Sequence, residues 1–142
     1  AFACASKHSS GYCVTVSVDT VDFLQPIEVG ELVAVIATVH YVGNSSMVIG
    51  IKIIAENVYT STVRHTNTSY FTMVSKDQSD KLKKVPGLIL ETKEEVKNFM
   101  DALKRKQMKD FYKNELQKIH EAPITEESIS EILIEERCIV AH

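Results

Sequence analysis

The sequence lacks a long hydrophobic run. No stretch approaches the roughly 18 to 20 apolar residues that a membrane-spanning helix needs, and no basic segment followed by an apolar one opens the chain. With 142 residues, 44% of them hydrophobic, the chain can bury one core and is too short for two large domains. These features predict a cytoplasmic domain with no membrane partner.

Cysteine is scarce, and its spacing points to no metal or redox site. Cys4, Cys13 and Cys138 form none of the C-x-x-C pairs that zinc and redox sites use. His40 and His65 have no Cys or second His at ligand spacing. We therefore expect buried or incidental free thiols and no metal.

Several catalytic and binding motifs are also missing. The chain has no Gly-x-Ser-x-Gly elbow and no Gly-rich phosphate loop, which argues against Ser-His-Asp hydrolysis, nucleotide hydrolysis and dinucleotide redox chemistry. The net charge of −3 and the lack of aromatic residues interleaved with the basic ones argue against a nucleic-acid partner.

Charge is unevenly distributed in the second half of the chain. Lys81 to His120 contains eleven Lys or Arg residues against six acids, whereas Glu121 to His142 contains six acids and Arg137. The basic stretch could face phosphates, pair with the acidic tail or form a solvated helix face. The last two explanations require no ligand.

The chain opens with small residues that favour a short helix. Residues 1–8 are rich in Ala, and Ser9-Ser10-Gly11 is expected to end the helix with Gly11 in the left-handed conformation. No capping residue precedes Ala1, and a helix of about two turns is marginal alone. We expect this helix to be the remainder of a longer one.

Four segments read as strands. Cys13 to Phe23 alternates Val with Thr or Ser, with Val14, Val16 and Val18 on one face, which is typical of a half-buried strand. The other three are long runs rich in β-branched and aromatic residues: Leu32 to Tyr41, Met47 to Tyr59, and Val63 to Val74.

The short turns at Gly43-Asn44 and Tyr59-Thr60-Ser61 force neighbouring strands to be antiparallel. We therefore predict one helix followed by a four-strand antiparallel meander. The opening helix is the available cover for the apolar face of this sheet.

A polar connector and two helices complete the chain. Residues 76–90 read as a connector closing on Val85-Pro86-Gly87, and Thr92 with Glu95 forms a capping box that begins a long amphipathic helix. A break at Ala122-Pro123 precedes a third helix. The predicted domains are residues 1–80, a connector 81–91 and a helical hairpin extension 92–142, expected to fold back on its own body or a neighbouring subunit.

Four segments, taken in order, resemble the acyl-CoA thioesterase family of the hotdog superfamily. They are Ala5-Ser6-Lys7-His8-Ser9, VTVSVDTVDFLQPIEVGE from Val14 to Glu31, YVGNSSM from Tyr41 to Met47, and YFTMV from Tyr70 to Val74. The resemblance covers about residues 1–76. It implies an α+β hotdog fold, an antiparallel sheet wrapped around a central helix, here with its N-terminal part missing and a C-terminal helical extension added.

The resemblance also implies a catalytic arrangement that residues 1–142 do not contain. In the family, an acidic residue near the start of the central helix acts as base or nucleophile, and backbone amides polarise the thioester carbonyl. These motif positions would lie before Ala1, so no catalytic residue is carried over. Asp19 and Asp22 do not replace them, because residues three apart on a strand lie on opposite faces.

Nine residues are candidate substrate contacts. The resemblance places the segment from Val18 to Phe23 in an interface groove near the acyl chain and places coenzyme A near the turn after Val42. A Gly-Asn-Ser-Ser turn offers amides and hydroxyls to polar ligands, although an ordinary hairpin turn with positive φ at Gly and Asn explains it equally well. Arg64 is either a phosphate contact or an exposed strand residue. The candidates are Val18, Asp19, Asp22, Phe23, Gly43, Asn44, Ser45, Ser46 and Arg64.

Two functions follow as hypotheses. The first is hydrolysis of acyl-CoA to free fatty acid and coenzyme A by a homodimer or dimer-based higher oligomer, with no cofactor beyond the coenzyme A of the substrate. The second is a non-catalytic hotdog module that binds acyl-CoA or mediates assembly, because the fold alone does not fix the chemistry.

Overall fold

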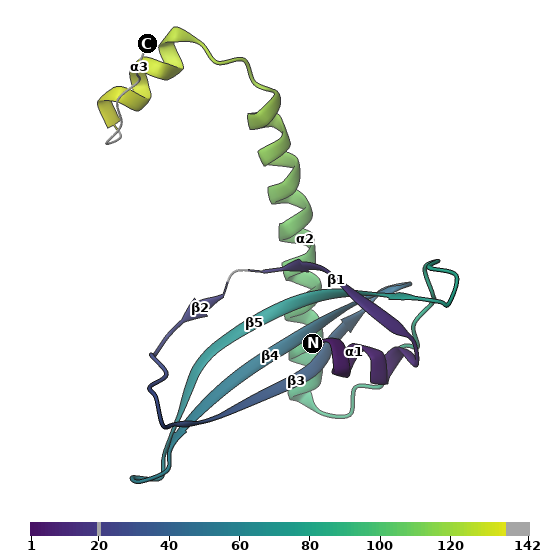
Figure 1. Ribbon diagram of the computed structural model, residues 1–142. Coiled ribbons are helices and arrows are strands. Elements are labelled where there is room, and N and C mark those ends of the chain that lie inside the picture. The colour runs from purple at the N-terminus through teal and green to yellow at the C-terminus, as the bar shows by residue number, and fades with distance from the viewer. Residues whose placement is uncertain (20, 136–142) are drawn as a thin grey trace. The chain divides into compact units, whose positions relative to one another are not determined.

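In the computed structural model, residues 1–19 and 21–135 are described. Residues 1–104 form one compact unit, and a second begins at Arg105. The helices and strands are α1 Phe2–Ser9, β1 Tyr12–Val18, β2 Asp22–Phe23, β3 Leu32–Val42, β4 Ser46–Asn57, β5 Thr62–Lys76, α2 Lys93–Glu121 and α3 Glu126–Glu135 (Figure 1).

The strands form one antiparallel sheet in the order β1-β5-β4-β3, with the short β2 also on β5. The predicted meander is correct for β3, β4 and β5 and wrong for the first strand, which pairs with β5 at the far edge of the sheet. The reason is the connection from β2 to β3. Residues 24–31 are long enough to carry the chain from the β5 side of the sheet to its other edge, so adjacency is not enforced.

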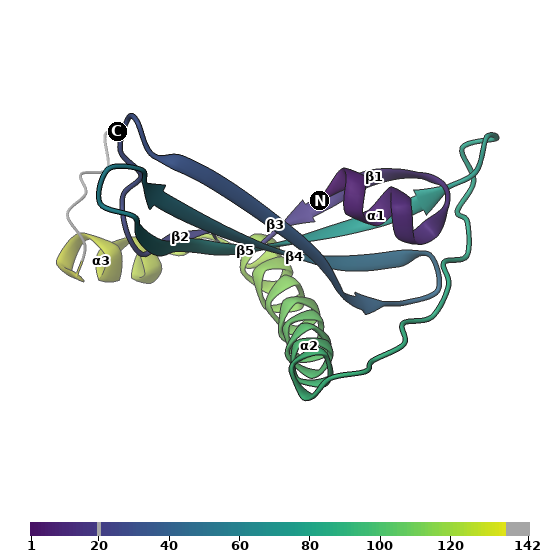
Figure 2. The same cartoon turned by 90° about the horizontal axis from the view of Figure 1, so that it is seen from below.

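The core lies between α1 and one face of the sheet (Figure 2). Ala5 is fully buried, and its small side chain lets α1 approach the strands closely. The core residues are Ala5, Cys13, Met47, Ile49, Ile51, Met73 and Val85. The expectation that the opening helix covers the sheet is confirmed, and the fold is α+β, with a helix packed against one face of an antiparallel sheet.

The end of α1 differs from the prediction. Ser10, with φ 49° and ψ 40°, adopts the left-handed conformation that was expected of Gly11. Gly11 serves another purpose, because a Cβ there would lie 3.0 Å from Ser75 Oγ and 3.2 Å from the Lys83 side chain. Its missing side chain allows β5 and the connector to approach the turn.

The buried face of β1 is also not the one predicted. Cys13 is 2% exposed and packs in the core, whereas Val16 and Val18 are 56% and 49% exposed. A bulge between Thr15 and Ser17 disturbs the register with β5, so strict alternation is lost. Cys13 is a buried free thiol as expected, Cys4 is half-buried, and Cys138 lies outside the described residues.

The turns use different residues for left-handed backbone than predicted. Among the described residues Gly43 and Asn44 have no positive φ, whereas Ser61, in the turn after β4, has φ 53°. That second turn is held by Asn57 Oδ1, which accepts hydrogen bonds from the Tyr59 and Thr60 amides.

The connector after β5 is part of the core unit and not a free linker. Val85 is 5% exposed, and its amide donates to the Asn44 carbonyl at 2.9 Å. Lys83 Nζ donates to the Ser10 carbonyl at 2.7 Å, which satisfies the C-terminal end of α1, and a 3.0 Å hydrogen bond joins His8 Nε2 to the Pro86 carbonyl.

The predicted capping box of α2 is confirmed. The Glu95 amide donates to Thr92 Oγ1 at 3.2 Å, and the Thr92 amide donates to Glu95 Oε2 at 2.9 Å. The break at Ala122-Pro123 is confirmed as well, because α2 ends at Glu121 and α3 begins at Glu126. None of the described helices combines the length and the apolar character that crossing a membrane requires. The predicted packing of the helical extension stays a prediction.

Candidate functional site

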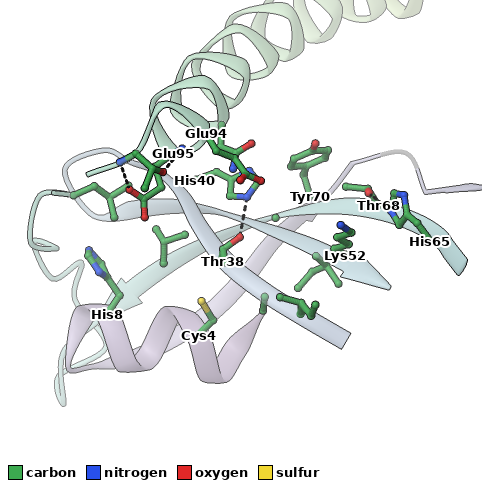
Figure 3. A pocket seen from close by; sticks show the side chains of 18 residues that line it. Cys4, His8, Thr38, His40, Lys52, His65, Thr68, Tyr70, Glu94 and Glu95 are labelled. Atoms are coloured by element: carbon green, nitrogen blue, oxygen red, sulfur yellow. Dashed lines mark hydrogen bonds between the residues drawn. The ribbon is translucent and has the colours of Figure 1, made fainter. Parts of the chain in front are cut away.

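A cavity of about 860 Å³ runs along β3, the strand at the edge of the described sheet (Figure 3). Five consecutive residues of β3, 36–40, line it, together with α1 on one side and the start of α2 on the other. Its size lies within the range of small-molecule sites, about 300 to 1,000 Å³. The polar lining residues are Cys4, His8, Thr38, His40, Lys52, His65, Thr68, Tyr70, Thr92, Glu94, Glu95 and Asn98.

His40 lies across β4 above Gly50. A Cβ at Gly50 would lie within 2.8 Å of three atoms of the His40 ring, so only glycine leaves room for the imidazole there. A 2.9 Å hydrogen bond joins Thr38 Oγ1 and His40 Nε2, and the Tyr70 ring meets the imidazole edge-to-face at 5.8 Å. The ring is therefore held in place by three neighbouring strands.

The charged groups of the cavity come from opposite sides. Lys52 projects from β4, and Glu94 and Glu95 come from the first turn of α2. Hydrogen bonds from the Glu91 and Thr92 amides lower the pKa of Glu95, so this carboxylate stays ionised. Its Oε2 accepts both bonds and therefore serves the helix cap. An anionic group in the cavity would be attracted to the Lys52 side and repelled from the α2 side.

Cys4 is the one cysteine among the described residues that line this cavity. Burial raises the pKa of its thiol, and the positive charge of Lys7 opposes this only in part. A raised pKa lowers the fraction of reactive thiolate at neutral pH. Cys4 is therefore poorly suited to nucleophilic catalysis.

The predicted turn after Val42 is tied to the connector and β5. The Gly43 amide donates to the Ser46 carbonyl at 2.8 Å, and the carbonyls of Asn44 and Ser45 accept from Val85 and Ser75. These contacts fix the turn at the same end of the sheet as the C-terminus of α1. Its contact with coenzyme A stays a prediction.

The predicted contacts on the first strand lie along the edge of β5. Val18 pairs with Phe71, the Asp19 amide donates to the Tyr70 carbonyl at 2.9 Å, and Phe23 lies opposite Asn67. Asp22 lies opposite Thr68 in the backbone register. The structure therefore brings these four residues together on one edge, with Val18 and Phe23 exposed.

Arg64 lies near the opposite end of the sheet from the turn. It pairs with Ala55, while Ser46 stands at the other end of β4, and at about 3.4 Å per residue the two positions are roughly 30 Å apart. Arg64 Nη2 lies 2.8 Å from both carboxylate oxygens of Glu31. Within one chain, Arg64 and the turn cannot touch the same phosphate.

Sequence reasoning missed most residues of the cavity. Thr38, His40, Gly50, Lys52 and Tyr70 come together only through the register of β3, β4 and β5. The short turns predicted that β3, β4 and β5 are neighbours, but the sequence did not fix their register, which shifts at a bulge in each pairing.

Comparison with known proteins identifies the family. The family model described as "Thioesterase superfamily" matches residues 1–62. Protein VdlD of Helicobacter pylori is 39% identical over 109 residues, covering 77% of this chain and 62% of VdlD. The chain thus spans about 60% of the length of this relative.

Solved structures extend the similarity. Acyl-CoA hydrolase from Staphylococcus aureus, in complex with butyryl coenzyme A, coenzyme A and coenzyme A disulfide, is 33% identical, with a TM-score of 0.73 over 82% of this chain and 71% of that one. A hexameric acyl-CoA thioesterase is 32% identical, with a TM-score of 0.73 over 76% of this chain and 69% of that one. The chain belongs to the thioesterase superfamily, among the acyl-CoA hydrolases of the hotdog fold.

Proposed function

We propose that the protein containing this chain hydrolyses acyl-CoA thioesters to free fatty acid and coenzyme A. The observation that carries the proposal is the similarity to the S. aureus acyl-CoA hydrolase, a structure with butyryl coenzyme A, over most of both chains. The described residues supply a sheet edge with exposed apolar side chains and a separate polar cavity. This division suits a substrate in which an apolar acyl chain is joined to the charged coenzyme A.

The coenzyme A part of the substrate would lie at the cavity along β3. Lys52 provides the cation for a phosphate group, and the hydroxyls of Thr38, Thr68 and Tyr70 provide further polar contacts on the same side. The turn from Gly43 to Ser46 follows directly on β3, so both predicted and newly found polar groups adjoin one strand.

The acyl chain would lie along the edge formed by β1 and β2, where Val18 and Phe23 are exposed. The similarity to a hexameric thioesterase supports an oligomer. In the proposed dimer-based oligomer, this edge faces a second subunit. Within the described residues no carboxylate lies on α1, so no catalytic residue is assigned there.

The test is thiol release from a series of acyl-CoA thioesters, measured for residues 1–142 and for the same chain with any residues that precede Ala1 in the natural protein. Hydrolysis of any thioester, with release of coenzyme A, is the expected result. A well-folded protein that binds acyl-CoA without hydrolysing it would instead support the non-catalytic binding module.

A further inference from the structure

Glu31 and Arg64 form a largely buried ion pair at the end of the sheet. The Glu31 side chain is 4% exposed and that of Arg64 is 26% exposed. Arg64 lies opposite Ala55, which is on the same face of β4 as the core residue Ile51. The pair therefore lies on the face that α1 covers, and the small side chain of Ala55 leaves room for it.

This pair holds the loop of residues 24–31 at two points, and a backbone hydrogen bond fixes the start of the loop. Arg64 Nη2 also donates to the Pro26 carbonyl at 3.2 Å, and the Glu28 amide donates to Glu31 Oε2 at 2.9 Å. At the start of the loop, the Leu24 amide donates to the Thr66 carbonyl at 2.9 Å. A loop of eight residues with these contacts has a defined backbone path.

The same loop presents apolar side chains to solvent. Leu24 is 66% exposed, Ile27 is 40% exposed, and Phe23 immediately before the loop is 74% exposed. Apolar side chains that stay exposed on an ordered loop mark a surface that meets an apolar partner or ligand. The loop also continues directly from β2, the edge proposed to border the acyl chain.

We propose that Glu31 and Arg64 are positioning residues, which hold residues 23–27 as an apolar wall against the distal part of the acyl chain and so determine chain-length preference. The inference rests on the proposed thioesterase function. Each methylene group that reaches the wall adds apolar contact, so the effect of the ion pair must grow with chain length. Short acyl groups do not reach the wall and are insensitive to it.

The test compares Glu31→Gln with the wild type across saturated acyl-CoA substrates from butyryl to palmitoyl. We expect KM for the longest chains to rise about tenfold and KM for butyryl-CoA to change less than about twofold. We expect kcat for butyryl-CoA to be unchanged. Arg64→Lys, which keeps the charge, should retain most of the long-chain preference, and Ile27→Ala should lower it without touching the ion pair.

Glu115→Gln is the matched control, because it makes the same chemical change in an exposed pair, with Lys118. It should leave the whole profile unchanged. Circular dichroism establishes that each variant is folded, and Ile27→Ala tests the wall even where Glu31→Gln fails to fold. If KM changed equally at all chain lengths, the ion pair would have a purely structural role. If the oligomeric state changed, the loop would be a subunit contact. Either result overturns the proposal.

If the wild type hydrolyses no acyl-CoA, the proposed function fails, but the wall can still be tested by binding. Calorimetric dissociation constants for the same series then replace KM. Tighter binding of longer chains that is lost in Ile27→Ala supports the wall. Binding that is independent of chain length, or absent, overturns it.

Discussion

Gly50 is the residue whose missing side chain shapes the cavity. Glycine inside a strand usually weakens it, so alanine would ordinarily be stabilising. Here we expect Gly50→Ala to destabilise the protein by about 1 to 3 kcal/mol, because the new methyl group occupies the space of the His40 ring. The free energy of unfolding from urea titration measures this effect.

Gly87 offers a matched control, because nothing lies within 4 Å of the position that its Cβ would take. Gly87→Ala should change stability by less than about 0.5 kcal/mol. The double variant His40→Ala with Gly50→Ala should recover much of the lost stability. If Gly50→Ala left the free energy of unfolding unchanged, the position of the His40 ring would not depend on the missing side chain at residue 50.

Lys52 tests where the charged part of the substrate lies. In Lys52→Ala, we expect KM for acyl-CoA to rise about tenfold, because the proposed phosphate contact is removed, with no dependence on acyl-chain length. The effect should weaken as salt is added, because salt screens exposed charges. Lys104→Ala, on α2, is the control; if both variants behaved alike, Lys52 would have no special role.

The sequence could not show these contacts in advance. His40 belongs to no recognisable sequence motif, and nothing in the sequence distinguishes Gly50 from other glycines. Only the register of β3 and β4 places the two residues together. The predicted contacts at Val18, Asp19, Asp22 and Phe23 do share one edge, because they are close in the chain. Arg64 was predicted to be either a phosphate contact or an exposed strand residue. The fold pairs it with Glu31, and a phosphate contact stays a prediction.

At the scale of elements, the strength of local signals decided which predictions were correct. The capping box at Thr92, the break at Ala122-Pro123 and the turns between β3, β4 and β5 involve residues close in sequence, and all are confirmed. The pairing of β1 with β5 links residues about 60 positions apart and depends on the whole sheet. Local patterns carry no information on such pairings.

The start of α2 should depend on pH through Glu95. Its pKa is lowered below 4.5 in the folded protein, so it binds protons less readily there than in the unfolded chain. Its contribution to the helix is fully present above pH 4.5 and is lost as pH falls through the folded value. The protection of the first-turn amides, measured by hydrogen exchange between pH 3 and 6 and corrected for the intrinsic exchange rate at each pH, should fall at the acidic end.

Glu95→Gln should remove most of this pH dependence. Thr92→Ala should weaken the same turn by about 1 kcal/mol at every pH, because the cap to the Glu95 amide is lost. Thr92→Ser keeps the hydroxyl and should behave like the wild type. A pH dependence that persists in Glu95→Gln would have to come from another carboxylate.

At the scale of the whole molecule, the compact unit ends within α2 and not before it. Phe99 packs on Tyr41 with ring centroids 5.2 Å apart, and Ala102 is fully buried. We therefore expect residues 1–104 to fold alone with nearly the melting temperature of the full chain. Residues 1–87 should melt lower and associate more strongly, because the removed helix exposes Tyr41.

Thermal unfolding and size-exclusion chromatography of the two shortened chains measure these effects. If residues 1–87 matched the full chain in both, α2 would contribute nothing to the body. If residues 1–104 failed to fold, the second unit would be required as well. Either result would also test the predicted domain boundary near residue 80.

The family and the fold class were predictable from short segments, because these segments combine strand pattern and turn chemistry in a fixed order. The catalytic group was not, because residues 1–76 contain no acid on the opening helix and a resemblance transfers only residues that are present. The polar cavity required the three-dimensional register.

The position of Val85 in the core sets a condition on how the protein is made. Val85 packs with Ala5 and Cys13, and Lys83 and Pro86 contact the end of α1 at sequence separations above 70. During synthesis, α1 and β1 therefore emerge from the ribosome about 70 residues before the connector that packs against them, and β5 emerges only about ten residues before it. Such non-local closure makes folding slow and leaves the nascent strands prone to aggregation. Newly made chains should accordingly need protection by chaperones until the connector has been synthesised.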